Sequence, residues 1–160
     1  MDKRELHHQL IQQVSTDLEK ARAAAMAAAE GATHEENKAE GRKDMRATEA
    51  AYLARGQTLR VEALEDALLR IRQVPLRRFS EDTPIAAGAL IQLTDEQDSP
   101  RWVFLMPAAA GVELHDGQNI ITTITTRSPL GRELVEKLLG DEIEIYLGES
   151  LQFFEITELL

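Results

Sequence analysis

The chain has 160 residues, a formal net charge of −10 and no cysteine. This length fits one domain or two small modules and excludes a large multidomain enzyme. Without cysteine there are no disulfides and no thiolate metal sites, and the excess of acid argues against a protein that reads or wraps duplex DNA.

The remaining composition is that of a globular protein with long helices. Apolar residues make up 43 % of the chain, whereas aromatic residues make up only 4 %. Residues 1–13 lack the apolar core of a secretory signal, and no apolar run is long enough to span a membrane. We therefore expect a cytoplasmic protein without membrane contact. The acid is concentrated in one half, because residues 1–73 carry 12 basic and 13 acidic residues and residues 74–160 carry 6 and 15.

Two apolar stripes with spacings of three and four residues predict two long helices. The first stripe comprises Leu6, Leu10, Val14, Leu18, Ala21, Ala25 and Ala28. The second comprises Ala47, Ala50, Ala54, Gln57, Val61, Leu64, Leu68 and Ile71. Gly31 predicts the end of the first helix and Pro75 the end of the second. Helices joined by a few residues run antiparallel, so residues 1–75 predict an antiparallel coiled-coil hairpin.

The residues between the two stripes form the predicted tip of the hairpin. Thr33 and Glu36 have the spacing of a capping box, which predicts that the second helix begins near His34. Acidic residues gather here, at Glu35, Glu36 and Glu40. Acid in a first helical turn is explained by capping and by the helix dipole. The alternative is that these carboxylates contribute to a metal site completed by a partner.

Residues 76–160 change from helical periodicity to short β-rich runs bounded by Gly, Pro and Asp. After a linker at residues 76–84, strands are predicted at residues 89–94, 102–106, 120–126, 142–146 and 151–156. Ser128 as N-cap and Pro129 at the first helical position predict a helix that ends at Gly140. The second half is therefore predicted to be a small antiparallel sheet with one helix, and the whole chain is α+β.

Motifs of the common enzyme classes are absent from the sequence. There is no phosphate-binding loop, no dinucleotide-binding fingerprint, no zinc-protease motif and no nucleophile elbow. His7 and His8 are adjacent and would point about 100° apart on a helix, so they do not clasp one metal. His34 and His115 are interpreted as isolated loop residues.

Residues 126–145, TRSPLGRELVEKLLGDEIEI, resemble the C-terminal signature of the GreA/GreB transcription elongation factors. The resemblance covers the Ser-Pro-Leu-Gly-Arg turn, the helix after it and the Gly-Asp pair before the next strand. Glu36-Asn37 is similar to the family's tip pattern. The order of modules agrees too, since the family has an N-terminal coiled coil and a C-terminal FKBP-like domain, here residues 76–160.

This resemblance implies a protein that binds bacterial RNA polymerase at its secondary channel and has no active site of its own. The FKBP-like domain would dock on the polymerase, and the coiled-coil tip would reach toward the active site and contact nascent RNA indirectly. The implied docking residues are Ser128, Pro129 and Leu130. The implied tip residues are Thr33, Asn37 and Glu40, with Glu36 and Glu35 as ligands of a Mg²⁺ ion held jointly with the polymerase.

One position departs from the family. The family's first tip acid falls on Thr33, which carries no charge, although Glu35 is an extra acid nearby. The resemblance therefore leaves two functions open, a factor that stimulates transcript cleavage and a secondary-channel regulator that does not. Two further alternatives are a protein-interaction or chaperone-like module of FKBP fold and, by fold analogy alone, a peptidyl-prolyl isomerase.

Overall fold

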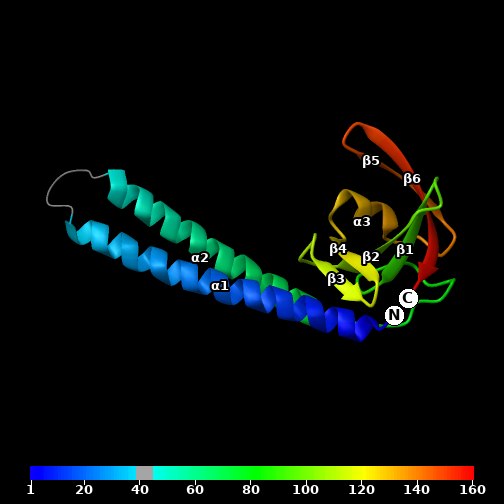
Figure 1. Ribbon diagram of the computed structural model, residues 1–160, viewed down its shortest axis with the longest axis horizontal. Coiled ribbons are helices and arrows are strands. Elements are labelled where there is room, and N and C mark those ends of the chain that lie inside the picture. The colour runs from blue at the N-terminus through cyan, green and yellow to red at the C-terminus, as the bar shows by residue number, and fades with distance from the viewer. Residues whose placement is uncertain (39–44) are drawn as a thin grey trace. The chain divides into compact units, whose positions relative to one another are not determined.

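The computed structural model describes residues 1–38 and 45–160 (Figure 1). The chain divides into two compact units, one of Met1–Ile11 with Arg70–Leu160 and one of Gln12–Leu69. No helix within the two described ranges is both long and apolar enough to cross a membrane.

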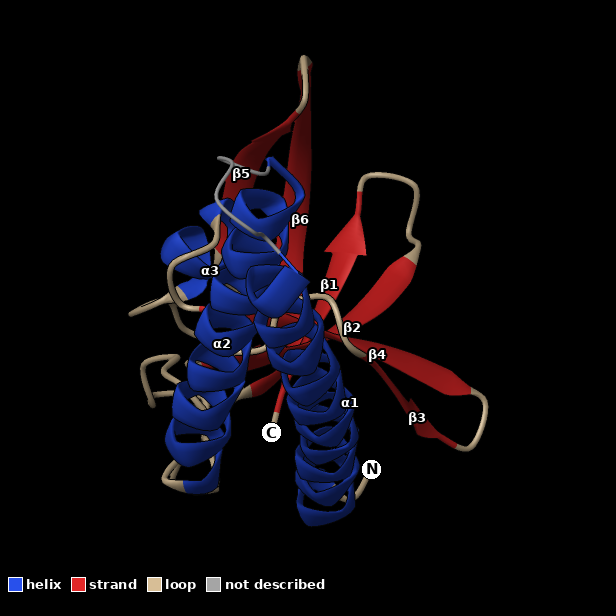
Figure 2. Ribbon diagram, turned by 90° about the vertical axis from the view of Figure 1, so that its left-hand side faces the viewer, coloured by secondary structure: helices blue, strands red, loops and turns tan. Residues whose placement is uncertain are grey.

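Two long helices form the first part of the chain, α1 at Lys3–Lys38 and α2 at Met45–Arg72. They lie side by side and antiparallel (Figures 1 and 2). The predicted stripe of α1 is its buried face, with Leu10 fully buried and Leu18 5 % exposed. In α2 every predicted stripe position is half-buried or buried, ending in Leu68 and Ile71. An ion pair of 2.7 Å between Arg22 Nη2 and Glu65 Oε1 joins the exposed sides of the two helices.

The prediction that the first helix ends at Gly31 is wrong, because α1 continues to Lys38. Ala32 is only 8 % exposed and stands four residues after Ala28, so it adds one more position to the buried stripe. A glycine inside a helix costs about 1 kcal/mol relative to alanine, which packing of the following turn can offset. The prediction that the second helix begins near His34 is wrong for the same reason.

A six-stranded sheet forms most of the unit that contains Arg70–Leu160. Its strands are β1 (Leu90–Asp95), β2 (Pro100–Met106), β3 (Glu113–Asp116), β4 (Asn119–Thr125), β5 (Glu142–Leu147) and β6 (Ser150–Leu159). They lie in the order β3-β4-β2-β1-β6-β5. The predicted α+β class and the five predicted strands are confirmed.

The prediction of a wholly antiparallel sheet is wrong for one pair of strands. Neighbouring strands are antiparallel except for β2 and β4, which are parallel. The cause is β3, a four-residue strand that the sequence analysis missed because Leu114 is its only apolar residue. β3 occupies the outer edge, so the tight turn at Gly117, with φ of 62°, returns β4 beside β2 in the parallel direction. His115, predicted to lie in a loop, belongs to β3.

Strand alternation builds the core of this unit. Ile91 and Leu93 of β1 pack with Val103 and Leu105 of β2, together with residues of α3 (Pro129–Leu134), β5 and β6. The intervening residues, such as Phe104, are also fully buried. Both faces of the central strands are therefore covered, which fixes the register of the sheet.

Helix α3 is shorter than predicted. Ser128 is its N-cap and Pro129 its first residue, as expected, but the helix ends at Leu134 and not at Gly140. The backbone N–H of Glu136 instead donates to Ile85 O at 2.9 Å, and Ile85 N donates to Lys137 O at 2.8 Å. These two bonds to a distant segment replace the next helical turn, and Glu136 takes a positive φ of 68° to make them.

The first turns of α1 are hydrogen-bonded to other residues of the unit that contains the sheet. The side-chain amide of Gln9 donates to His115 O at 3.0 Å and accepts from His115 N at 3.1 Å, so it extends the edge strand β3. His7 Nε2 lies 2.9 Å from Ile71 O. Residues 3–11 are thus held by the sheet as well as by the helix to which they belong.

We expect Lys3 to make stability depend on pH in the alkaline range. Burial, and secondly the charge of Arg77, lower the pKa of Lys3 from 10.5 to about 8. Between these two pH values the unfolded chain binds more protons than the folded chain, so the contribution of Lys3 to the free energy of unfolding rises with pH. Relative to Lys3→Met, the wild type should therefore gain stability from pH 7 to pH 10 in urea unfolding.

The control for this prediction is Lys20→Met, which removes an exposed lysine from the same helix. The stability difference between Lys3→Met and the wild type should change more between the two pH values than the difference for Lys20→Met. If the two differences change equally, the lowered pKa of Lys3 is wrong.

Candidate functional site

The first candidate region is the end of α1, where the tip acids were predicted. Thr33 is exposed and lies within the helix, and its hydroxyl donates to Ala29 O at 3.0 Å. It is therefore not an N-cap, and the predicted capping box with Glu36 is wrong. The hydroxyl is engaged in a bond to the preceding turn, which is common for threonine inside helices.

For the other predicted tip residues that belong to α1, only the backbone is described. Glu35, Glu36 and Asn37 lie on the last turn of α1, and nothing is described of their side chains. Glu40 lies outside the described residues. Among the side chains that the structure describes, which do not include those of Glu35 and Glu36, no three His, Asp or Glu residues come together as a metal site. Thr33 offers a neutral hydroxyl that already donates to the helix, so this position contributes no carboxylate to a metal ion.

The second candidate region is the turn that leads into α3. Ser128 Oγ donates to Thr125 O at 2.7 Å and accepts from Gly131 N at 3.1 Å. Ser128 N also donates to Thr125 O, at 3.0 Å. The hydroxyl therefore closes the turn behind it and caps the helix ahead of it.

Gly131 is required by the same turn. A Cβ atom at this position would stand 1.9 Å from Thr125 O and 3.0 Å from Ser128 Oγ. The carbonyl cannot move aside, because it accepts both hydrogen bonds from Ser128. The Ser-Pro-Leu-Gly sequence is thus explained by geometry: serine caps, proline starts the helix, and glycine admits the carbonyl.

The predicted docking residues differ in exposure. Ser128 is engaged in the cap, and Leu130 packs against the core, whereas Pro129 is exposed. Pro129 borders a shallow depression of about 440 Å³ together with residues of α3 and of the β5–β6 hairpin. We call it the Pro129 surface, and its members are Pro129, Arg132, Glu133, Glu144, Ile145, Tyr146 and Leu151.

The sequence analysis missed Tyr146 and Leu151, which supply the apolar part of this surface. Tyr146 is 69 % exposed and Leu151 38 % exposed, and the two residues are paired across the β5–β6 hairpin. The alternation of residues along β5 could have identified Tyr146 from the sequence. Since Ile143 and Ile145 alternate inward on β5, Tyr146 has to point outward beside Glu144.

The chain combines a helical hairpin with an α+β domain that contains a capped Ser-Pro turn. No model of a protein family matches the chain. The GreA transcription elongation factor of Rhodospirillum rubrum is 29 % identical over 98 residues, which is 61 % of this chain and 59 % of that protein. GreA of Nitrobacter hamburgensis is 31 % identical over 100 residues, 62 % of this chain and 60 % of that protein.

Among solved structures, the chain is similar to GreA factor homolog 1 of Thermus thermophilus. It is 22 % identical over 94 % of each chain, with a TM-score of 0.40. The matches to the two curated GreA proteins span about 60 % of the length of those proteins. These relatives confirm the resemblance to GreA/GreB that the sequence indicated.

Proposed function

We propose that this chain is a Gre-like accessory factor that binds bacterial RNA polymerase at its secondary channel. The observation that carries the proposal is the turn at Ser128–Gly131, whose residues resemble the family signature and whose serine, proline and glycine are explained by its geometry. The curated relatives named transcription elongation factor GreA support the same reading. Such a factor works through the active site of the polymerase, in the bacterial cytoplasm, and carries no active site of its own.

The Pro129 surface is the proposed docking surface. It combines a rigid proline, an exposed tyrosine and a leucine with the charged side chains Arg132, Glu133 and Glu144. An exposed aromatic residue inside a polar rim is typical of a protein interface. Ser128 and Leu130 support this surface from within, by capping the helix and by packing on the core.

The tip of the hairpin is proposed to enter the channel toward nascent RNA. Glu36 and Glu35 are proposed to hold a Mg²⁺ ion jointly with polymerase carboxylates, because a hard cation prefers oxygen ligands from several sources. Thr33 supplies no charge where the family has an acid, and its hydroxyl is bonded to Ala29. We therefore favour a regulator whose unmodified form stimulates transcript cleavage by the polymerase weakly or not at all.

Polymerase binding tests this proposal. We expect Tyr146→Ser to weaken binding of the full-length chain to RNA polymerase by about tenfold or more, as expected when an aromatic anchor is removed. The matched control is Ile120→Ser, which removes a residue of similar exposure, 55 %, from β4. The measurement is competition for the polymerase against a fluorescently labelled wild-type chain, with thermal unfolding to verify that both variants fold.

If Tyr146→Ser binds polymerase as tightly as the wild type, the Pro129 surface is not the docking surface. Failure of the wild type to bind polymerase at all would overturn the proposed function. The chain would then be better described as a chaperone-like module if it also suppressed aggregation of an unfolded client.

A further inference from the structure

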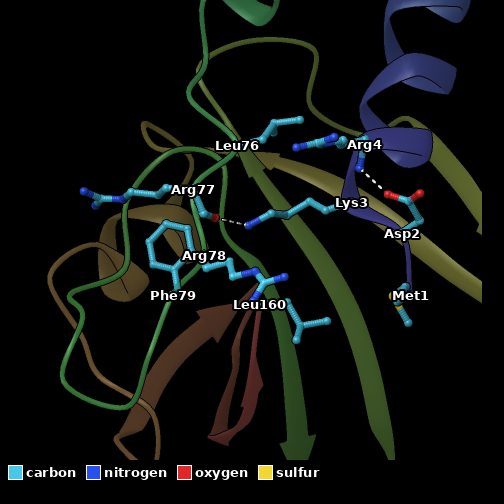
Figure 3. Close-up of a pocket in the computed structure, with 9 residues that line it drawn as sticks. All are labelled: Met1, Asp2, Lys3, Arg4, Leu76, Arg77, Arg78, Phe79 and Leu160. Atoms are coloured by element: carbon cyan, nitrogen blue, oxygen red, sulfur yellow. Dashed lines mark hydrogen bonds between the residues drawn. The ribbon is translucent and has the colours of Figure 1, made fainter.

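A cluster of basic side chains lines a pocket in the unit formed by residues 1–11 and 70–160. Lys3 and Arg4 come from the first turn of α1, and Arg77 and Arg78 from the segment after α2 (Figure 3). The pocket has a volume of about 680 Å³. Its remaining walls are formed by Met1, Asp2, Leu76, Phe79 and Leu160.

These cations are not neutralised by their surroundings. Among the described residues, no carboxylate lies within 4.0 Å of the charged nitrogens of Lys3, Arg4, Arg77 or Arg78. Asp2 lines the pocket, but its Oδ1 accepts from the backbone N–H groups of Arg4 and Glu5, at 2.9 and 3.4 Å. The pocket therefore gathers four cationic side chains and one side-chain carboxylate, beside the terminal residues Met1 and Leu160, in a chain whose net charge is −10.

Two of the cations, Lys3 and Arg77, are held by contacts with neutral groups. Lys3 Nζ donates to Arg77 O at 2.5 Å and lies 4.9 Å from the centre of the Phe79 ring. The Arg77 guanidinium lies at the same distance from that ring. In Figure 3 the Lys3 side chain extends toward the backbone oxygen of Arg77, whereas the Arg77 side chain runs away from Lys3. Burial lowers the pKa of Lys3 and the charge of Arg77 lowers it further, so an anion in the pocket would stabilise these cations.

The geometry points to a binding site for a small oligophosphate, the chemical group shared by pyrophosphate and the phosphate chain of a nucleotide. Guanidinium groups bind phosphate oxygens through paired, charge-assisted hydrogen bonds, and several cations around one cavity suit several linked phosphates. A nucleic acid strand would instead require cations along an extended groove.

The same pocket offers no platform for a base. Phe79 is only 8 % exposed, and Lys3 and Arg77 already lie against its ring. Recognition would thus depend on the phosphates alone, and pyrophosphate should bind about as well as the corresponding part of a nucleotide. None of the residues of this pocket belongs to the predicted tip or to the Pro129 surface, so the proposal does not rest on the proposed function.

The test is calorimetric titration of the full-length chain with pyrophosphate in a buffer free of phosphate. We expect saturable binding of one equivalent. The double variant Arg77→Gln/Arg78→Gln should weaken it by about tenfold or more, because two charge-assisted hydrogen-bond donors are lost. The matched control is Arg127→Gln/Arg132→Gln, which removes the same charge from the same unit and should change the affinity by less than about twofold.

A second readout follows the protonation of Lys3 by NMR. Its pKa is lowered to about 8 by burial and by Arg77, with Arg4, Arg78 and Asp2 as the other charged side chains of the pocket. Bound pyrophosphate should raise this pKa, since a nearby anion stabilises the ammonium form. A purely structural role of the arginines would leave it unchanged.

Three outcomes would overturn the site. The first is equal weakening by the two double variants, which would mean general attraction of anions. The second is an unchanged pKa of Lys3 at saturating pyrophosphate. The third is preference for a single-stranded RNA oligomer over pyrophosphate and ATP, which would make the cluster part of a nucleic acid surface. Binding of ATP and pyrophosphate but not of adenosine would support it.

Discussion

Replacing Gly131 with alanine is expected to destabilise the unit that contains the sheet by about 4 kcal/mol, at the upper end of single substitutions. The added Cβ would meet Thr125 O at 1.9 Å. Relief would require that carbonyl to move, which would break the two hydrogen bonds it accepts from Ser128 and uncap α3. Urea unfolding followed by circular dichroism should show the loss, together with loss of polymerase binding.

The matched control is Gly117→Ala in the β3–β4 turn. Gly117 has φ of 62°, yet a Cβ there would meet nothing within 4 Å. This variant therefore introduces backbone strain without a clash and should cost about 1 kcal/mol. If Gly131→Ala proves as mild as Gly117→Ala, the close approach of Thr125 O to Gly131 is wrong.

Thr33→Asp is expected to produce the largest functional change, a rise in transcript cleavage of about tenfold or more from a weak or absent wild-type level. This prediction rests on the proposed function. The substitution supplies the acid that the family has at this position, and carboxylate oxygens bind divalent cations where a neutral hydroxyl does not. Because Thr33 is exposed, the helix should tolerate the change. The measurement is shortening of labelled RNA in a stalled polymerase complex.

Two further variants separate charge from shape at the tip. Thr33→Asn has nearly the same shape as the aspartate variant without its charge and should leave cleavage at the wild-type level. Glu36→Gln, added to Thr33→Asp, should abolish the gain while thermal unfolding is unchanged. Strong cleavage by the unmodified chain would contradict the prediction and would indicate that Glu35 or Glu40 replaces the missing acid.

The helical stripes and the strands could be predicted from the sequence because each is a local periodic pattern. Every predicted seam position from Leu6 to Ala28 and from Ala47 to Ile71 is at least half-buried in the structure. The cap of α3 could be predicted for a similar reason, since Ser128 and Pro129 act on residues within one turn. In these cases the interactions that decide the structure lie within a few residues of each other.

Positions where elements end were harder to predict, because distant residues compete there with local preference. Gly31 is a common helix terminator, yet the buried position of Ala32 carries α1 onward. Residues 135–139 have a helical pattern, yet hydrogen bonds to Ile85 end α3 at Leu134. β3 contains a single apolar residue, and it forms a strand because its backbone pairs with β4.

The sequence by itself determined the α+β class, the helical hairpin, the strand positions other than β3, and the resemblance to the GreA/GreB family. Only the tertiary structure decided which side chains share a surface. Pro129 lines one depression with Tyr146 and Leu151, and Lys3 is hydrogen-bonded to Arg77 across 74 residues of chain. The physical reason is that periodicity reports which face of one element is buried, whereas the meeting of two elements depends on how the whole chain packs.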